Sequence, residues 1–217
     1  WLHPCSGAGD MCSAVSTSIQ IGLLATLGAT ILGTLIAYAL MRYKFRGRSL
    51  TNLLIFLPMA SPEVVMGSSL LTLFVSLGFP LGFWTILIAH IMFCMSFVVV
   101  TVKARLASMD PRLEQAAMDL YATEWQTFRK VTLPLLLPGI ASAALLSFSL
   151  SFDDFIVTNF NSGSTITFPM FVWGVSQRGI PPQVNVVGAA VFLIALFFVI
   201  VGQLASARKA KALQAKG

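Results

Sequence analysis

The stretch DPRLEQAAMDLYATEWQTFRKVTLPLLLP, from Asp110 to Pro138, is a long polar segment set between hydrophobic runs. Asp110 followed by Pro111 favours a helix start, because the Asp side chain can accept a free backbone N–H and Pro fits the first helical position. An apolar face then follows at helical spacing, formed by Leu113, Ala116, Ala117, Leu120 and Tyr121. The segment is therefore predicted to begin with a short amphipathic helix.

A second helix start lies within the same segment. Thr123 and Gln126 have the spacing of a capping box, in which each side chain satisfies the other residue's free backbone N–H. We therefore expect a helix, a sharp turn and a second helix that leads into the next apolar run. Such a surface suits docking into a partner's groove.

The composition of the whole chain indicates a membrane protein. Of its 217 residues, 57% are hydrophobic and 10% are charged, against about 25% charged in a typical soluble domain. The mean hydropathy is +0.85. The net charge of +6 does not indicate nucleic acid as a partner, because the basic residues lie beside apolar runs and form no separate basic domain.

Apolar runs in the chain are long enough to cross a hydrocarbon core of about 30 Å at about 1.5 Å per residue. The five expected spans cover residues 19–40, 53–77, 83–102, 133–152 and 184–205. In the first span a small residue recurs at every fourth position, which lets another helix approach closely; these residues are Ala25, Ala29, Gly33 and Ala37. The predicted fold class is an all-α membrane protein, a polytopic bundle of transmembrane helices.

The positive charges predict the orientation of these spans. All but Arg178 of the 14 Lys and Arg residues fall on the cytoplasmic side if the chain starts outside and ends inside. Residues 1–18 are then an extracytoplasmic segment, 19–205 a transmembrane domain containing a cytoplasmic loop at 103–132, and 206–217 a basic cytoplasmic tail. Cys5 and Cys12 either pair or remain free thiols in the first of these segments.

Two polar residues are expected inside the spans. Glu63 falls near mid-membrane after Pro58 and Pro62, which bend their helix and free backbone carbonyl groups. A carboxylate at that depth is either functional or a protonated or hydrogen-bonded structural residue. His90 stands alone in an apolar run and is expected to be a hydrogen-bonded packing residue.

Asp153 and Asp154 form an acidic pair at the end of the fourth span. Adjacent carboxylates repel unless they are solvated or neutralised, so the pair either attends a cation or forms an ordinary solvated helix end. The chain beyond them is mixed, with an amphipathic piece at Phe168–Val175 that is expected on the outer surface with Trp173 at the interface.

The segment that begins at Asp110 resembles the cytoplasmic loop of the inner-membrane permease subunits of ABC importers. The pattern of that loop is E-A-A, three residues, G, nine residues, then I-x-L-P. This chain has, at those positions, Gln115, Ala116, Ala117, Tyr121, Val131, Leu133 and Pro134. Glu114 can supply the carboxylate of the first position. The resemblance implies that the loop couples to an ATPase subunit through Glu114, Gln115, Ala116, Ala117, Asp119, Leu120, Tyr121, Leu133 and Pro134.

Three further stretches resemble the polyamine subgroup of these permeases, which carries spermidine and putrescine. They are LPMASPEVV at Leu57–Val65, SFDDFIVTNFNSG at Ser151–Gly163 and RGIPPQVN at Arg178–Asn185. Acidic residues of that subgroup are implicated in passing the cationic substrate, and the resemblance carries this role to Glu63, Asp153 and Asp154. Nearby aromatic rings can attract ammonium groups, although most aromatics in membrane proteins serve packing; these rings are Phe152, Phe155, Phe160 and Trp173.

The resemblance implies a permease subunit in the bacterial cytoplasmic membrane that forms half of a translocation path. The implied partners are two ATPase subunits, a second related permease and an extracytoplasmic substrate-binding protein. The sequence shows no phosphate-binding loop, no nucleophile elbow and no clustered His and Cys, so no catalytic site, metal or cofactor is expected in this chain. ATP and Mg are expected on the ATPase. Permeases of this kind usually have six spans, so the chain is expected to begin after, or to lack, one helix.

Two other functions remain open from the sequence. A proton- or cation-coupled secondary transporter would use Glu63 and His90, and it predicts inverted repeats that the sequence does not show. A membrane scaffold or channel subunit with no pumping role would use the loop only to anchor a partner. Dependence of uptake on ATP and on a copurifying ATPase distinguishes the importer from both.

Overall fold

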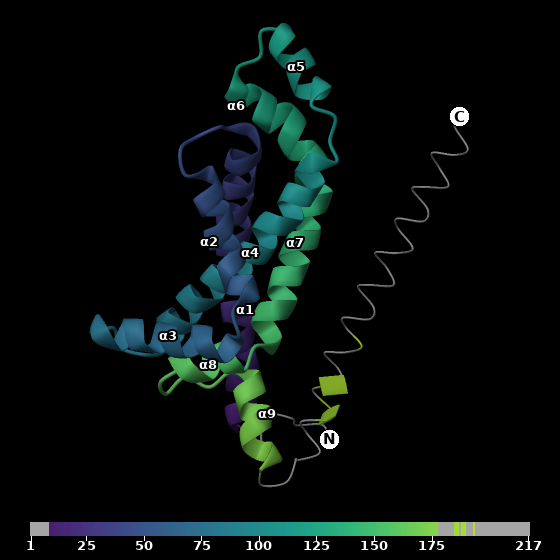
Figure 1. The fold of residues 1–217 in the computed structure, drawn as a ribbon. Helices are drawn as coiled ribbons and strands as arrows, with labels where there is room; N and C mark the ends of the chain where they lie inside the picture. The colour runs from purple at the N-terminus through teal and green to yellow at the C-terminus, as the bar shows by residue number, and fades with distance from the viewer. Residues whose placement is uncertain (1–8, 178–184, 187, 190–192, 194–217) are drawn as a thin grey trace. The chain divides into compact units, whose positions relative to one another are not determined.

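The structure is a computed structural model that describes residues 9–177, 185–186, 188–189 and 193. Within these residues it contains helices and no strand, which confirms the predicted fold class. The elements are α1 (Gly9–Arg42), α2 (Arg48–Ala60), α3 (Glu63–Ser76), α4 (Phe83–Ala107), α5 (Arg112–Asp119), α6 (Glu124–Thr127), the π-helical turn η1 (Phe128–Thr132), α7 (Leu133–Asp153), α8 (Ile156–Asn161) and α9 (Phe168–Ser176). The chain divides into two compact units, and residues 14–170 form the unit in which the contacts below are found (Figure 1).

Three helical stretches of the described chain are long and apolar enough to cross a membrane. They are Met11–Arg42, Phe83–Ala107 and Glu124–Asp153, the last of which joins α6, η1 and α7 into one run of 30 residues. These stretches confirm the first, third and fourth expected spans. The fifth expected span lies almost wholly outside the described residues, as do the basic tail and Cys5. Cys12 takes part in a disulfide.

The expected start of the first span is wrong, because α1 begins at Gly9 and not at residue 19. Its packed face extends toward the N-terminus at helical spacing. Ala14 and Ser18 are 1% and 3% exposed, in register with the buried Ile21 and Ala25. Small and hydroxyl side chains therefore continue the buried face of α1 into residues 9–18.

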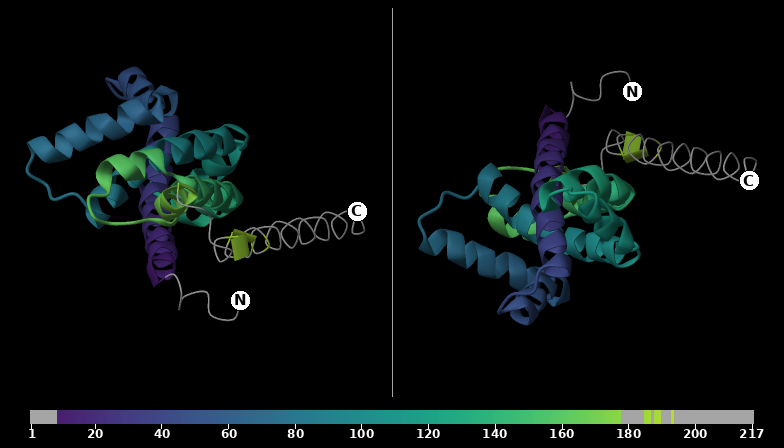
Figure 2. Two further views of the ribbon diagram at one scale, coloured as in Figure 1. Left: turned by 90° about the horizontal axis from the view of Figure 1, so that it is seen from below. Right: turned by 90° about the horizontal axis from the view of Figure 1, so that it is seen from above.

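The second expected span consists of two helices. α2 and α3 meet at an angle of 109°, so α3 runs across the direction of α1, α4 and α7 (Figures 1 and 2). Pro62 disfavours a helical conformation at Ser61, which is extended with ψ at 139°. The Ser61 N–H and hydroxyl both donate to the Leu57 carbonyl, at 3.0 and 2.8 Å, and end α2 there. Pro58 lies inside α2 without breaking it.

The small residues of α1 lie in the core, as their spacing predicted. Ala25, Ala29 and Ala37 are fully buried. A methyl group at Gly33 would lie 2.7 Å from Val98 Cγ1 on α4 and 3.2 Å from the Met95 carbonyl oxygen. A β-branched side chain in a helix has one strongly preferred rotamer, so Val98 cannot turn away. The close approach of α1 to α4 therefore depends on the glycine.

Gly33→Ala is expected to leave the protein less stable than the matched Gly28→Ala variant by about 1–3 kcal/mol, the usual cost of overfilling a packed core. At Gly28 the atoms nearest the added methyl group all belong to the Ile91 side chain and none to the backbone, with Cδ1 at 3.0 Å and Cγ1 at 3.2 Å, both farther than the 2.7 Å contact at Gly33. Both substitutions gain the same helix propensity, so the comparison isolates packing. Thermal unfolding of the detergent-solubilised protein measures the difference, and equal unfolding temperatures would contradict the close approach.

Candidate functional site

A buried polar cluster around His90 holds the end of α7 to α8. His90 Nδ1 lies 2.6 Å from Ser151 Oγ, and His90 Nε2 lies 2.9 Å from Thr158 Oγ1. The Thr158 hydroxyl donates to Asp154 Oδ2 at 2.8 Å. A neutral imidazole gives every side chain of the cluster a hydrogen-bond partner, because Ser151 can donate to His90 Nδ1 while His90 Nε2–H donates to Thr158. His90 is therefore the hydrogen-bonded packing residue that the sequence predicted.

Asp154 turns the chain from α7 into α8. Its Oδ2 accepts the N–H of Thr158 at 2.8 Å and its Oδ1 accepts the N–H of Val157 at 3.4 Å, so the carboxylate caps the start of α8. His90 Nε2 also lies 3.3 Å from Oδ2. Asp154 is only 8% exposed. Of the two alternatives for the acidic pair, an ordinary solvated helix end therefore does not describe the buried Asp154, whereas its neighbour Asp153 is exposed.

Further hydrogen bonds hold α8 beside α3 and α4. Asn161 Nδ2 donates to the Gly67 carbonyl of α3 at 3.3 Å, and the Thr85 hydroxyl of α4 donates to the Asn161 carbonyl at 2.7 Å. A methyl group at Gly67 would lie 2.9 Å from Phe160 Cδ2, so a glycine is needed for this approach. As a result the first residue of α3, Glu63, lies near the end of α7.

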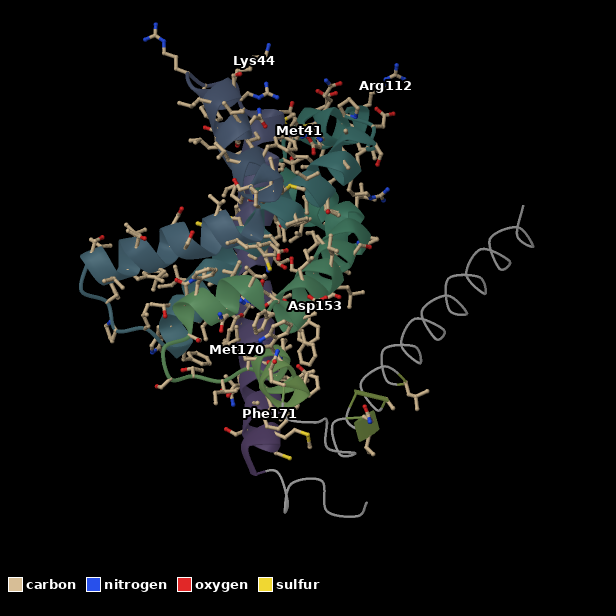
Figure 3. The ribbon with its side chains drawn as sticks, turned by 60° about the horizontal axis from the view of Figure 1, so that its bottom comes forward. Met41, Lys44, Arg112, Asp153, Met170 and Phe171 are labelled. Atoms are coloured by element: carbon tan, nitrogen blue, oxygen red, sulfur yellow. The ribbon has the colours of Figure 1, made fainter. Side chains whose placement is uncertain are left out.

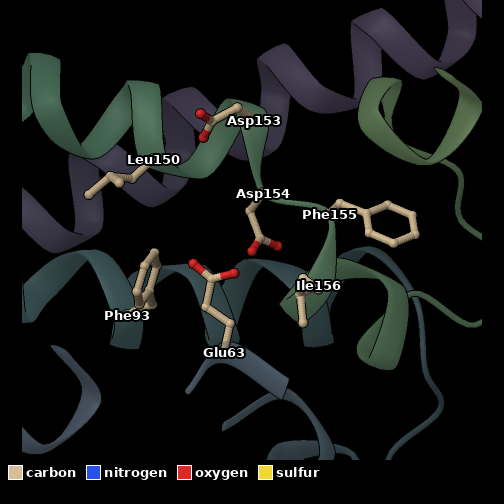
Figure 4. Close-up of a pocket in the computed structure, with 7 residues that line it drawn as sticks. All are labelled: Glu63, Phe93, Leu150, Asp153, Asp154, Phe155 and Ile156. Atoms are coloured by element: carbon tan, nitrogen blue, oxygen red, sulfur yellow. The ribbon is translucent and has the colours of Figure 1, made fainter. Parts of the chain in front are cut away.

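The three acidic residues predicted for the substrate pathway line one pocket of about 290 Å³. Its lining residues are Glu63, Phe93, Leu150, Asp153, Asp154, Phe155 and Ile156. Figure 4 shows the carboxylates of Glu63 and Asp154 pointing toward one another, with Asp153 farther from Glu63. Among the described residues, neither Glu63 nor Asp153 has a hydrogen bond or ion pair to another residue. The pocket is therefore acidic and incompletely neutralised.

The predicted aromatic residues divide between this pocket and other places. Phe155 lines the pocket. Phe152 stacks on Phe148 with ring centroids 5.8 Å apart, so it packs within α7. Trp173 lies on α9 in the other compact unit and is not placed with respect to this pocket.

The other end of α7 leads to the loop that resembles a coupling loop. α5 and α6 lie beyond the ends of α1, α4 and α7 (Figure 1), and Lys44 and Arg112 mark this end in Figure 3. Both predicted helix starts are confirmed. Asp110 Oδ1 accepts the Arg112 N–H at 2.9 Å. Thr123 and Gln126 form the capping box, with bonds of 3.3 and 3.0 Å.

α5 buries a charge and exposes apolar side chains. Glu114 is 8% exposed, whereas Leu120 and Tyr121 are 81% and 97% exposed. Glu114 points inward and is not an exposed carboxylate of the loop. Of the other predicted coupling residues, Gln115, Ala116 and Asp119 are exposed, Ala117 is half-buried, and Leu133 and Pro134 form the first turn of α7. We define the docking surface as the exposed residues Leu113, Ala116, Leu120 and Tyr121.

Tyr121 stands at the Gly position of the loop pattern and has the backbone conformation that Gly favours. Its φ is 62°, the only positive value at a non-Gly residue in the described part of the chain. The Tyr121 N–H donates to the Met118 carbonyl at 2.9 Å and the Ala122 N–H to the Ala117 carbonyl at 3.1 Å, which closes α5 with a Schellman motif. The turn is retained at a conformational cost of about 1–2 kcal/mol.

Comparison with known proteins identifies the family of this chain. Residues 29–211 match the family of the inner membrane component of binding-protein-dependent transport systems. The chain belongs to this family. The permease is 39% identical over 212 residues to the spermidine/putrescine transport system permease protein PotC of Escherichia coli K12, with 97% of this chain and 80% of PotC covered. It is 42% identical over 183 residues to the putrescine transport system permease protein PotI of the same organism, with 81% and 65% covered.

Solved transporter structures share the fold of this permease. A crystal structure of an amino acid ABC transporter with histidines matches with a TM-score of 0.68 at 18% identity, over 92% of this chain and 94% of that chain. The inward-facing MetNI methionine ABC transporter matches with a TM-score of 0.71 at 18% identity, over 93% and 95%. The permease is thus an inner-membrane transport component of a class that works with ATPase and binding-protein partners. This favours the importer over the secondary-transporter and scaffold alternatives.

Sequence reasoning missed three of the residues that line the pocket of the permease. Phe93, Leu150 and Ile156 are apolar residues in apolar runs, so nothing in their type marks them. A positional signal existed for Phe93, which lies three residues after His90 and therefore on the same side of α4. Leu150 likewise lies one turn before Asp153 on α7.

Proposed function

We propose that this permease forms half of the translocation path of an ATP-driven importer for linear polyamines such as spermidine or putrescine. The named functions of PotC and PotI support this substrate class. The observation that carries the proposal is the pocket that Glu63, Asp153 and Asp154 line together with Phe93 and Phe155.

The chemistry of the pocket suits a cationic chain. Glu63 and Asp154 face one another, and a cation between two carboxylates stabilises both charges. Asp154 Oδ2 is occupied by His90 and Thr158, but among the described residues its Oδ1 accepts only the 3.4 Å bond from Val157. An ammonium group would therefore bind Glu63 and Asp154 Oδ1, while the methylene groups contact apolar walls that exclude water.

The size of the pocket fits a half-site. A volume of about 290 Å³ lies just below the range of about 300–1,000 Å³ typical of small-molecule sites. We propose that a second, related permease supplies the other half. Asp153, which is exposed, would extend the acidic surface along the path.

The docking surface is proposed to receive one of two ATPase subunits, which bind ATP and Mg. Closure of the ATPase pair would then move the helices between inward and outward access. In the proposed arrangement, the loop and the C-terminus lie in the cytoplasm and the N-terminus of the chain lies outside. An extracytoplasmic binding protein would deliver the substrate.

Uptake by the reconstituted complex tests the proposal. Proteoliposomes containing both permeases and the ATPase, supplied with the binding protein, should accumulate labelled spermidine or putrescine only with ATP inside. Unlabelled polyamine should compete, and histidine or methionine should not. Uptake driven by an ion gradient without ATP would overturn the importer, and uptake of an amino acid in place of polyamines would overturn the substrate class.

A further inference from the structure

The end of α1 is joined to the loop by an ion pair between residues distant in sequence. Arg42 Nη2 lies 2.8 Å from Glu114 Oε1, and the same oxygen accepts the Thr132 hydroxyl at 2.8 Å. The two charged side chains are only 22% and 11% exposed. One carboxylate oxygen therefore joins α1, α5 and η1.

Two further contacts join α1 and the residue that follows it to η1 and α6. Tyr43 Oη donates to Glu124 Oε2 of α6 at 3.0 Å, and this hydrogen bond raises the pKa of Tyr43. The ring of Tyr38 lies 4.7 Å from the ring of Phe128 in η1. We define the junction as these three contacts, Arg42–Glu114, Tyr43–Glu124 and Tyr38–Phe128.

The junction matters because of how the loop is connected. The loop is continuous in sequence with α4 before it and with α7 after it, so a movement of α5 reaches these helices through the backbone. α1 has no such connection, since Arg42 and Glu114 are 72 residues apart. α1 also packs against both neighbours, through Gly33 on α4 and through Gly22, whose added methyl group would lie 3.0 Å from Phe148 on α7.

We propose that Arg42 and Glu114 are positioning residues for energy coupling, which make α1 move with α5 when the ATPase closes. This inference rests on the proposed function. An exposed ion pair would contribute little, but this pair is mostly buried, and loss of Arg42 leaves the Glu114 carboxylate without its countercharge. Glu114 acts inward through α1, while the docking surface meets the ATPase.

Alanine variants in the assembled complex test the junction. Arg42→Ala and Glu114→Ala should each lower the amount of polyamine imported per ATP hydrolysed by about fivefold or more, the lower end of the coupling between linked sites, while hydrolysis continues. The double variant should be no worse than either single variant, because the two residues act as one unit. Arg46→Ala is the matched control, since Arg46 is exposed and has no partner among the described residues.

A covalent replacement of the ion pair separates mechanical linkage from charge. Arg42→Cys combined with Glu114→Cys should be uncoupled until a bifunctional thiol reagent joins the two positions, and the joined complex should recover import per ATP. The same reagent on the wild-type complex is the control. An import ratio that stays low after joining would overturn the inference.

Milder variants keep the test decisive if an alanine variant does not assemble. Arg42→Lys keeps the charge and should retain more coupling than Arg42→Ala, and Tyr43→Phe removes a single exposed hydrogen bond. If Arg42→Ala, Glu114→Ala and their double variant all import as much polyamine per ATP hydrolysed as the wild type, the role of the junction is overturned. The proposed import function would still stand. If the wild-type complex shows no polyamine-stimulated hydrolysis, the proposed function itself fails.

Discussion

Ala116→Asp should abolish polyamine-stimulated ATP hydrolysis while the two permeases stay assembled. Ala116 is exposed between Leu113 and Leu120 on the docking surface, so a carboxylate there would be buried without a partner when the ATPase binds. Burial of an unpaired charge costs several kcal/mol. Binding of the ATPase should therefore weaken by about a hundredfold or more, since about 1.4 kcal/mol corresponds to a factor of ten. Copurification of the ATPase and hydrolysis with and without spermidine measure the effect.

Ala107→Asp is the matched control for this substitution. Ala107 is the exposed last residue of α4 and lies outside the docking surface, so the same added charge should leave hydrolysis near the wild-type rate. Tyr121→Gly and Tyr121→Ala both remove the exposed ring, but only glycine relieves the left-handed backbone. If Tyr121→Gly and Tyr121→Ala lose the same amount of stimulated hydrolysis, the loss is due to removal of the ring. Normal ATPase binding by Ala116→Asp would show that α5 does not dock as proposed.

Glu63→Gln should raise the polyamine concentration needed for half-maximal uptake by about ten- to a hundredfold, the effect of losing an interaction of about 1.5–3 kcal/mol with a charged group. The fold should persist, because the Glu63 side chain has no hydrogen bond or ion pair within the described residues. Glu63→Asp keeps the charge and should be less affected. Ser69→Ala, an exposed polar position on the same helix outside the pocket, should match the wild type.

Asp154→Asn should instead lower stability, by about 1–3 kcal/mol. Asp154 Oδ2 accepts from Thr158 twice and faces His90, and an amide offers only one oxygen to these donors and Val157. Asp153→Asn should have the smallest effect of the three, since Asp153 lies apart from the facing carboxylates of Glu63 and Asp154 and makes no hydrogen bond to another described residue. Thermal unfolding and uptake, measured together, separate these roles. Unchanged uptake in Glu63→Gln would contradict the assignment of Glu63 to the cation.

The sequence predicted the features that depend on residues close together in the chain. The capping box at Thr123 and the helix start at Asp110 depend on residues within one turn, so their spacing was sufficient. The lengths of the long apolar runs likewise gave the spanning helices. The two prolines of the second span were a different case, because Pro58 is tolerated within α2 and Pro62 separates two helices. Which of the two prolines breaks the helix depends on tertiary packing, and the hydrophobic periodicity of the sequence does not reveal that packing.

The candidate site was predicted in part. Glu63, Asp153 and Asp154 were grouped by resemblance, and the structure brings all three to one pocket. Their separate roles could not be read from residue type. Asp154 differs from Asp153 because His90 and Thr158 lie next to it, and these contacts arise only when α4 and α8 meet. The four-residue spacing of Asp154 and Thr158 was a local signal for the cap.

In the proposed importer, the unbroken run from Glu124 to Asp153 would act as a lever between the loop and the acidic pocket. Its 30 residues correspond to about 45 Å of helix at about 1.5 Å per residue. Tilting such a rod by about 5° about one end displaces the other end by roughly 4 Å, a movement of the size found in hinged and sheared domains. One end carries the π-helical turn beside the docking helix, and the other ends at Asp153 in the acidic pocket. A small tilt at the proposed ATPase end would move the carboxylate of Asp154, the residue that directly follows α7, relative to Glu63 and so change how tightly the pocket holds a cation.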